Sequence, residues 1–165
     1  MIFVTVGTHE QPFNRLLECV DKLKEDNIIT EEVIMQTGFS TYVPKNCEWK
    51  KLFPYDAMIE NVKKARIVIT HGGPSSFIMP LQEGKIPIVV PRQKKYEEHV
   101  NDHQVDFAKA VAERQKNIIV VTDIKVLKDT LLNYDNIITK MDVSQQSNNA
   151  NFNKKLEIII DELFK

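Results

Sequence analysis

Two short runs in the middle of the chain are almost entirely apolar, and they limit the possible folds more than any other feature. They are RIVIT at residues 66–70 and IPIVVP at residues 86–91. Near-continuous runs of Ile and Val are typical of strands that are buried on both faces of a parallel sheet. The segment PSSFIMPLQEGK at residues 74–85 lies between them and has the length of a helix. A strand, helix and strand are therefore predicted here in succession.

The apolar patterns on either side continue this alternation. Strands are predicted over residues 2–7, 32–38, 47–55 and 117–121, and helices over residues 12–23, 56–65, 97–115 and 123–133. Strands that alternate with helices predict the α/β class, with a Rossmann-like parallel sheet, helices on both faces and right-handed crossovers.

The length of the chain sets the number of domains. A chain of 165 residues is long enough for one such domain and too short for two ordinary ones. We place this domain at residues 1–141, a polar connecting segment at residues 142–151, and an amphipathic helix at residues 152–165. The apolar stripe of that helix is predicted to pack on the domain or, alternatively, on a partner protein.

Charge and cysteine content exclude several classes of protein. The chain has 22 Lys and Arg against 23 Asp and Glu, so it lacks the positive excess of nucleic-acid-binding proteins. Cys19 and Cys47 have no C-x-x-C spacing and predict free thiols in a reducing compartment.

No apolar run approaches the roughly 20 residues that cross a bilayer, and the start MIFVTVGTHE lacks a signal-peptide pattern. We expect a cytoplasmic protein that meets a membrane peripherally or through a partner.

Four polar loops are predicted to lie along one edge of the sheet. In an open parallel sheet the ligand crevice forms beyond the carboxyl ends of the strands, where the strand order reverses. The loops that reach this edge are GTHEQP at 7–12, QTGFS at 36–40, THGGPSS at 70–76 and PRQKKYEEHVNDHQ at 91–104. Together they contain all four histidines of the chain, which is more polar crowding than a solvated surface requires.

The loop THGGPSS has the features of an anion-binding helix start. Gly72 and Gly73 permit positive φ and a close approach of a ligand to bare backbone. Pro74 suits the first helical position, so Ser75 and Ser76 fall in the first turn with free N–H groups and hydroxyls. Such a helix start favours phosphate or diphosphate. The alternative is a plain turn between strand and helix, in which the glycines are structural and a serine caps the helix.

The segment EEHVNDHQ permits three interpretations. His99 and His103 stand four residues apart, the spacing of a zinc-binding pair on one helical face, but Val100 replaces the glutamate of metalloproteases. Asp102, His103 and Gln104 offer donors and acceptors to sugar hydroxyls. The third interpretation is a polar, exposed helix start.

Two further residues are candidates on position alone. His9 follows the first strand and is a candidate base or oxygen-binding donor. Arg92 opens the basic run RQKKY beside the crevice, where it can help to hold a phosphate or an acidic partner.

With these loops in view, the sequence resembles the donor-binding half of the two-domain GT-B nucleotide-sugar glycosyltransferases. The resemblance rests on VTVGTHEQPFNRLL, QTG, THGGPSSFIMPLQEGKIPIVVPR and EHVNDHQ, and covers nearly the whole chain up to the Asn-rich segment. It is closest to the small single-domain subunits of glycosyltransferase family 28 C-terminal-domain type. These include the catalytic subunit of the eukaryotic dolichol-linked N-acetylglucosaminyltransferase and bacterial capsular and exopolysaccharide subunits, which the run after Thr70 resembles most.

The resemblance implies transfer of a sugar from a UDP-sugar to a polyprenyl-diphosphate-linked sugar at the inner face of the membrane. It implies that the sugar lies near Asp102, His103 and Gln104. It implies no metal or other cofactor, because the helix dipole and backbone donors neutralise the departing diphosphate. The residues that it places around the diphosphate are Gly7, Thr8, His71, Gly72, Gly73, Ser75 and Ser76.

One position departs from the pattern of the two-domain relatives. Met79 stands where many of them have a glutamate that holds the ribose hydroxyls, so this ribose contact is not carried over. Glu83 lies one turn later, and Pro80 makes its direction uncertain. Pro80 also predicts a kink or a short first turn in the helix.

The chain matches only the donor half of these enzymes, so the resemblance also implies a membrane-anchored acceptor subunit. The general base is then expected from that partner, with His9 as the weaker candidate, and a homo-oligomer is a further possibility. Two alternatives remain open: a UDP-sugar epimerase or hydrolase that uses Asp102 and His103 directly, and a non-catalytic nucleotide-sensing or scaffolding subunit.

Overall fold

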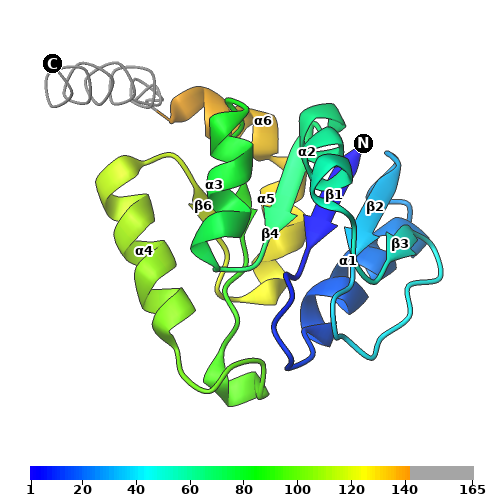
Figure 1. The fold of residues 1–165 in the computed structure, drawn as a ribbon. Coiled ribbons are helices and arrows are strands. Elements are labelled where there is room, and N and C mark those ends of the chain that lie inside the picture. The colour runs from blue at the N-terminus through cyan, green and yellow to red at the C-terminus, as the bar shows by residue number, and fades with distance from the viewer. Residues whose placement is uncertain (142–165) are drawn as a thin grey trace, which may run out of the picture.

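The computed structural model describes residues 1–141, and these form a single parallel sheet covered by helices (Figure 1). Six strands pair in the order β3-β2-β1-β4-β5-β6, and all five pairings are parallel. The strands are β1 Ile2–Thr5, β2 Val33–Gln36, β3 Glu48–Lys50, β4 Ile67–Thr70, β5 Ile88–Val89 and β6 Ile119–Val120. The predicted α/β class with a Rossmann-like parallel sheet is therefore confirmed. The two predictions for residues 142–151 and 152–165 lie outside the described residues.

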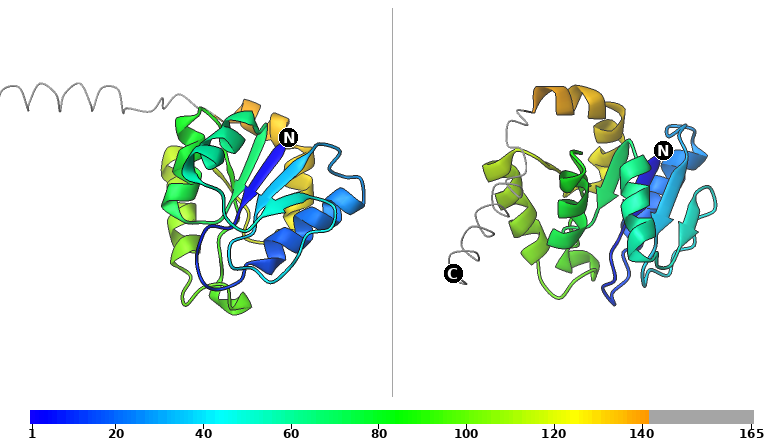
Figure 2. Two further views of the ribbon diagram at one scale, coloured as in Figure 1. Left: turned by 45° about the vertical axis from the view of Figure 1, so that its right-hand side comes forward. Right: turned by 45° about the horizontal axis from the view of Figure 1, so that its top comes forward.

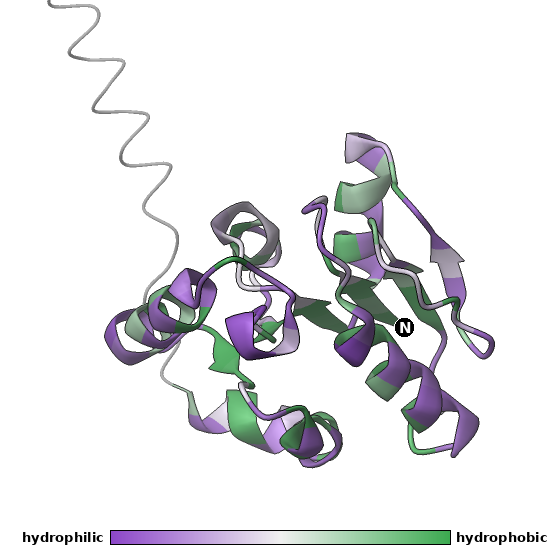
Figure 3. Ribbon diagram, turned by 90° about the horizontal axis from the view of Figure 1, so that it is seen from below, coloured by the Kyte–Doolittle hydropathy of each residue, from purple (hydrophilic) through white to green (hydrophobic). Residues whose placement is uncertain are grey.

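The helices cover both faces of the sheet, as expected (Figure 2). In chain order they are α1 Asn14–Glu25, α2 Tyr55–Lys64, α3 Pro74–Gln82, α4 His103–Gln115, α5 Leu127–Leu132 and α6 Tyr134–Lys140, with short 3-10 turns η1 Lys94–Tyr96 and η2 Ile124–Val126. Figure 3 shows hydrophobic strands in the interior and helices in which hydrophilic and hydrophobic residues alternate. Within residues 1–141, no helix combines the length and apolar character that a bilayer crossing requires.

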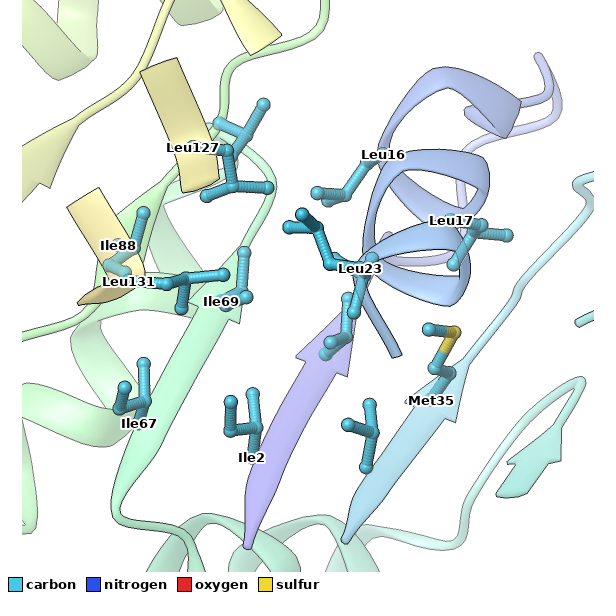
Figure 4. Close-up of a cluster of buried hydrophobic side chains, with 14 of the residues drawn as sticks. Ile2, Leu16, Leu17, Leu23, Met35, Ile67, Ile69, Ile88, Leu127 and Leu131 are labelled. Carbon is cyan, nitrogen blue, oxygen red and sulfur yellow. The ribbon is translucent and has the colours of Figure 1, made fainter. Parts of the chain in front are cut away.

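Alternation along the strands builds one core on each face. Ile2 and Val4 of β1 face the larger core, which α1, α5 and α6 cover, whereas Phe3 faces a second core under α2. In Figure 4, side chains of α1 and α5 lie over the strands. A third cluster joins α3 and α4 through Phe77 and Ala108. The strands have apolar residues on both faces because both faces are buried.

Several predicted boundaries differ from the structure. The third strand pairs with β2 only over Glu48–Lys50, so its predicted extension to residue 55 was wrong. The long helix begins at His103 and not at residue 97, because Glu97 has a left-handed φ of 59° and ends η1. Helix α6 was not predicted. In the structure, the Tyr134 hydroxyl at its start donates a 2.7 Å hydrogen bond to the carbonyl of Ile86. Helix α3 continues through Pro80 to Gln82, so the proline does not end it.

A buried carboxylate fastens the long loop after β2 to α1. Asp21 is 1% exposed, and it accepts hydrogen bonds from the Tyr42 hydroxyl at 2.7 Å and from the N–H groups of Lys45 and Asn46 at 3.0 and 2.8 Å. Burial alone would raise the pKa of Asp21, but the hydrogen bonds from Lys45, Tyr42 and Asn46 outweigh it and hold the pKa below its usual value. This carboxylate therefore stabilises the fold at neutral pH, and the contribution is lost as the pH falls below about 4, through the folded pKa.

Replacing Asp21 with alanine is expected to lower the free energy of unfolding by about 3 kcal/mol, because buried N–H donors lose a charged acceptor. The same change at Asp26, an exposed residue at the end of α1, is the control and should cost less than about 0.5 kcal/mol. Urea unfolding followed by circular dichroism measures both. Equal losses for the two variants would refute the anchoring role of Asp21.

Candidate functional site: a polar crevice at the carboxyl edge

The sheet order reverses between β1 and β4, and the loops that follow these two strands meet at that point. β1 pairs with β2 on one side and with β4 on the other. The strands β2 and β3 are thus added on one side of β1, and β4, β5 and β6 are added on the opposite side. Crevices form beyond the carboxyl ends of strands at such a switch point. Gly7 follows β1 and His71 follows β4, and these two residues are in direct contact.

The His71 ring lies between two glycines and is only 9% exposed. A Cβ atom added to Gly7 would lie 2.4 Å from Nε2 of His71, and one added to Gly73 would lie 2.2 Å from Cε1. Neither distance is possible for carbon in contact with a packed ring. Glycine is required at both positions because the ring fills the space that a side chain would occupy.

The role predicted for the glycine pair needs correction. Neither Gly72 nor Gly73 has a positive φ; among the glycines of residues 1–141, only Gly7, Gly38 and Gly84 do. The N–H of Gly72 donates to Oε1 of Gln104 at 3.0 Å, and the N–H of Gly73 donates to Nδ1 of His71 at 3.0 Å. The glycines therefore serve close packing, and both of their N–H groups are already bonded within the protein.

The donors that remain at the start of α3 belong to the two serines. The N–H of Ser76 bonds the carbonyl of Gly73 at 3.1 Å, so the predicted free N–H at Ser76 is absent. The N–H of Ser75 has no partner among residues 1–141, and the Ser75 side chain is exposed. Pro74 occupies the first helical position as predicted. One backbone N–H and two hydroxyls therefore stand at the positive end of the helix dipole.

Gln104 connects two of the loops that form the crevice. Its Oε1 accepts hydrogen bonds from the N–H groups of Gly72 at 3.0 Å and of Arg92 at 3.1 Å. A backbone N–H can only donate, so these two bonds place the carbonyl oxygen of the amide inward. Gln104 also lies in the wall of the cleft described next.

A cleft of about 590 Å³ opens between the start of α3 and the start of α4. Of the predicted donor-binding residues, Gly72, Gly73, His103 and Gln104 lie in its wall. The sequence did not single out Asn101, Asp106 and Phe107, which also line it, together with Pro74 and His99. Asp106 and Phe107 lie about one turn after Asp102 and His103, so a correct helix start would have indicated them.

The segment before α4 is a loop, and this overturns the prediction of a histidine pair on one helical face. His99 lies in this loop, whereas His103 is the first residue of α4. The ring of His99 instead stacks on His9, with ring centroids 4.6 Å apart. Burial lowers the pKa of His99, and the charges of His9 and Arg92 act in the same direction. Within residues 1–141, no three His, Cys, Asp or Glu side chains are grouped so as to hold a metal ion.

Arg92 is fully buried and stabilises the loop after β1 and the loop before α4 by hydrogen bonds. Its guanidinium donates to the carbonyls of Val6 at 2.8 Å, Gln11 at 2.6 Å and Glu98 at 3.1 Å. Burial lowers the pKa of Arg92 to about 10, so it is still charged at neutral pH. A side chain with 0% exposure has no surface to offer a ligand, so the predicted direct contact is replaced by a supporting role.

The carboxylate of Glu98 holds the loop against α1. It is 3% exposed and accepts from Nε and Nη2 of Arg15 at 2.8 and 3.0 Å. It also accepts the N–H of Gln93 at 3.0 Å. This pair fixes the loop that carries Arg92 and His99.

The remaining predicted residues, Thr8, His9 and Asp102, are not among those that line the cleft. Thr8 is exposed in the loop after β1. Asp102 is exposed, and its Oδ1 accepts a hydrogen bond from the N–H of Lys94 at 2.9 Å. This bond links the start of η1 to the end of the loop before α4. His9 is partly buried, with Nε2 3.0 Å from Oε1 of Gln11.

The family of the chain is shown by a match along almost its entire length. The model of the glycosyltransferase family 28 C-terminal domain matches residues 1–162. The chain belongs to this family. The cleft between the starts of α3 and α4 is the candidate functional site.

Two curated relatives share the name UDP-N-acetylglucosamine transferase subunit ALG13. The human protein is 33% identical over 117 residues, which are 66% of this chain and 10% of the relative. The mouse protein is 31% identical over 118 residues, 65% of this chain and 9% of the relative. The chain therefore spans about a tenth of the length of these relatives.

Solved glycosyltransferase structures have the same fold. The glycosyltransferase of kitacinnamycin aligns with a TM-score of 0.56 and 19% identity, over 80% of this chain and 33% of that protein. The forosaminyltransferase SpnP of spinosyn aligns with a TM-score of 0.55 and 15% identity, over 84% and 35%. These likenesses show the fold, which is that of GT-B C-terminal domains and corresponds to about a third of each enzyme.

Proposed function

We propose that this chain binds a UDP-sugar in the crevice and acts as the donor-binding subunit of a glycosyltransferase. The observation that carries the proposal is the group of hydrogen-bond donors at the start of α3, beside the cleft. The start of α3 presents the Ser75 N–H and two serine hydroxyls, while Oε1 of Gln104 accepts the N–H groups of Gly72 and Arg92 and Oγ of Ser76 is bonded to His71. Family membership and the names of the relatives support the same donor.

The chemistry of the step follows from the leaving group. As the bond from the sugar C1 to the diphosphate oxygen breaks, negative charge grows on the diphosphate. Donors and the dipole of α3 stabilise that charge without rearrangement, which lowers the barrier. We propose that no metal is required, and that Asp102, His103 and the Gln104 amide hold the sugar hydroxyls at the rim.

The acceptor is proposed to reach this crevice from a second protein. The relatives are named as subunits, and the chain aligns with about a third of the solved two-domain enzymes. We propose a membrane-anchored partner that presents a polyprenyl-diphosphate-linked sugar at the inner membrane face, in capsule or exopolysaccharide synthesis. His9 stacks on His99, which lines the cleft, and the partner is the stronger source of the general base.

Calorimetric titration of the full chain with UDP tests donor binding. UDP is expected to bind without added metal, and uridine at least about tenfold more weakly, because it lacks the diphosphate that the helix start attracts. The variant with Ser75→Ala and Ser76→Ala should lose about tenfold or more in UDP affinity. Thr139→Ala removes a hydroxyl from α6, away from the crevice, and is the control.

Two results would contradict the proposal. One is a folded wild-type chain that binds neither UDP nor UDP-sugars. The other is conversion of a UDP-sugar into a different UDP-sugar or a free sugar by the chain alone, which would indicate an epimerase or a hydrolase. Sugar transfer only when the partner and a lipid-linked acceptor are added is the expected outcome.

A further inference from the structure

Both ring nitrogens of His71 are hydrogen bonded, and one bond determines where the ring proton lies. Nδ1 is 3.0 Å from the N–H of Gly73, a group that can only donate. Nδ1 must therefore accept and carries no proton. The ring is 9% exposed, and burial, aided by the charge of Arg92, lowers the pKa of His71 to about 4. A neutral ring with a bare Nδ1 has its proton on Nε2.

The tautomer of His71 decides how the Ser76 hydroxyl is used. Nε2 of His71 is 2.8 Å from Oγ of Ser76, so the ring N–H donates to that oxygen. No other hydrogen bond of this hydroxyl occurs within residues 1–141, and its own proton is free to point away from the ring. Ser76 is partly exposed at the start of α3. The hydroxyl proton therefore cannot point at the ring and is available to an acceptor at the start of α3.

We propose that His71 is a positioning residue that acts through Ser76: its Nε2–H turns the Ser76 hydroxyl into an outward donor for an acceptor-only anion. This rests on the proposed function, in which that anion is the diphosphate of the UDP-sugar. A fully ionised diphosphate offers acceptors only, so a hydroxyl locked as a donor favours it over groups that donate. The His71 ring itself stays behind the loop, between Gly7 and Gly73, and does not touch the ligand.

Two substitutions at position 71 separate the ring's two hydrogen bonds. In His71→Asn the amide oxygen replaces Nδ1 and can accept the Gly73 N–H, but nothing replaces the donor to Ser76. In His71→Gln the amide nitrogen reaches the place of Nε2 and can donate to Ser76. UDP is expected to bind His71→Asn about tenfold more weakly than wild type, and His71→Gln at least about fivefold more tightly than His71→Asn. Urea unfolding of both variants controls for lost packing.

The Ser76→Ala background shows whether His71 acts through the hydroxyl. Without that hydroxyl, His71→Asn and His71→Gln should bind UDP with equal affinity. A difference that persists in the Ser76→Ala background would overturn the proposal, and so would equal affinities in the presence of Ser76. Non-additivity of this kind is the signature of two groups that act as one unit.

Nitrogen-15 NMR of the ring tests the hydrogen-bond arrangement without any ligand. The expected result is a protonated Nε2 and a bare Nδ1 in the free protein at pH 7, and a proton on Nδ1 would overturn the proposal. The NMR result also distinguishes the two failures. If the expected tautomer is found but wild-type protein binds no UDP, the proposed function is wrong and the hydrogen-bond arrangement is not.

Discussion

Replacing Gly7 with alanine is expected to lower the free energy of unfolding by about 3 kcal/mol, which is a large loss for one methyl group. Two costs add at this position. Gly7 has a φ of +74°, a left-handed conformation that costs an L-residue about 1 kcal/mol. The new Cβ would also lie 2.4 Å from Nε2 of His71, so the buried ring must move and its bond to Ser76 is lost.

Gly84 provides a matched control for the backbone cost alone. Its φ is +70°, close to that of Gly7, but no atom lies within 4 Å of an added Cβ. Gly84→Ala should therefore cost only about 1 kcal/mol and leave UDP binding unchanged. Urea unfolding and UDP titration of both variants separate the two contributions. Equal destabilisation of the two proteins would show that the ring accommodates the methyl group, and that its packing against Gly7 is unimportant.

The fold class was predictable because the main interactions are encoded locally. Ile67–Thr70 reads as a strand that is buried on both sides, and its apolar run alone indicates a parallel sheet. The start of α4 was not predictable in the same way. The polar residues before His103 suit a helix start, but the inward Glu98 meets Arg15, which lies 83 residues away in sequence. Local patterns carry no information about such a contact.

The location of the site was predictable, but its hydrogen bonds were not. A strand that is followed by His-Gly-Gly-Pro-Ser-Ser indicates a polar turn and a helix start at the carboxyl edge of the sheet. The structure has both at this position. The same residues predicted positive φ at Gly72 and Gly73. In the structure these glycines instead leave room for the side chains of His71 and Gln104. Which N–H groups remain free depends on side chains from two other loops, so a single motif could not reveal it.

Replacing Glu98 with alanine is expected to lower the free energy of unfolding by about 4 kcal/mol, because it leaves a charged guanidinium without its partner in a buried place. The Arg15 side chain is 13% exposed and that of Glu98 is 4% exposed. The N–H of Gln93 loses its acceptor at the same time. The loop that carries Arg92 should then loosen, and UDP affinity should fall together with stability. The same change at Glu60 is the matched control, since both side chains of its pair with Lys64 in α2 are 63% exposed and the change should leave stability nearly unaltered.

A double variant distinguishes the free-energy cost of burying an unpaired charge from the contribution of the Arg15–Glu98 ion pair to stability. Arg15→Met with Glu98→Leu removes both charges and keeps most of the buried volume, so its loss of stability should be well below that of Glu98→Ala. UDP affinity decides whether the ion pair also orients the loop. If the double variant is stable but binds UDP at least about tenfold more weakly, the pair positions the residues of the crevice beyond its effect on folding. If stability and UDP affinity are both retained, apolar packing at this point is sufficient, and the orienting role of Glu98 is refuted.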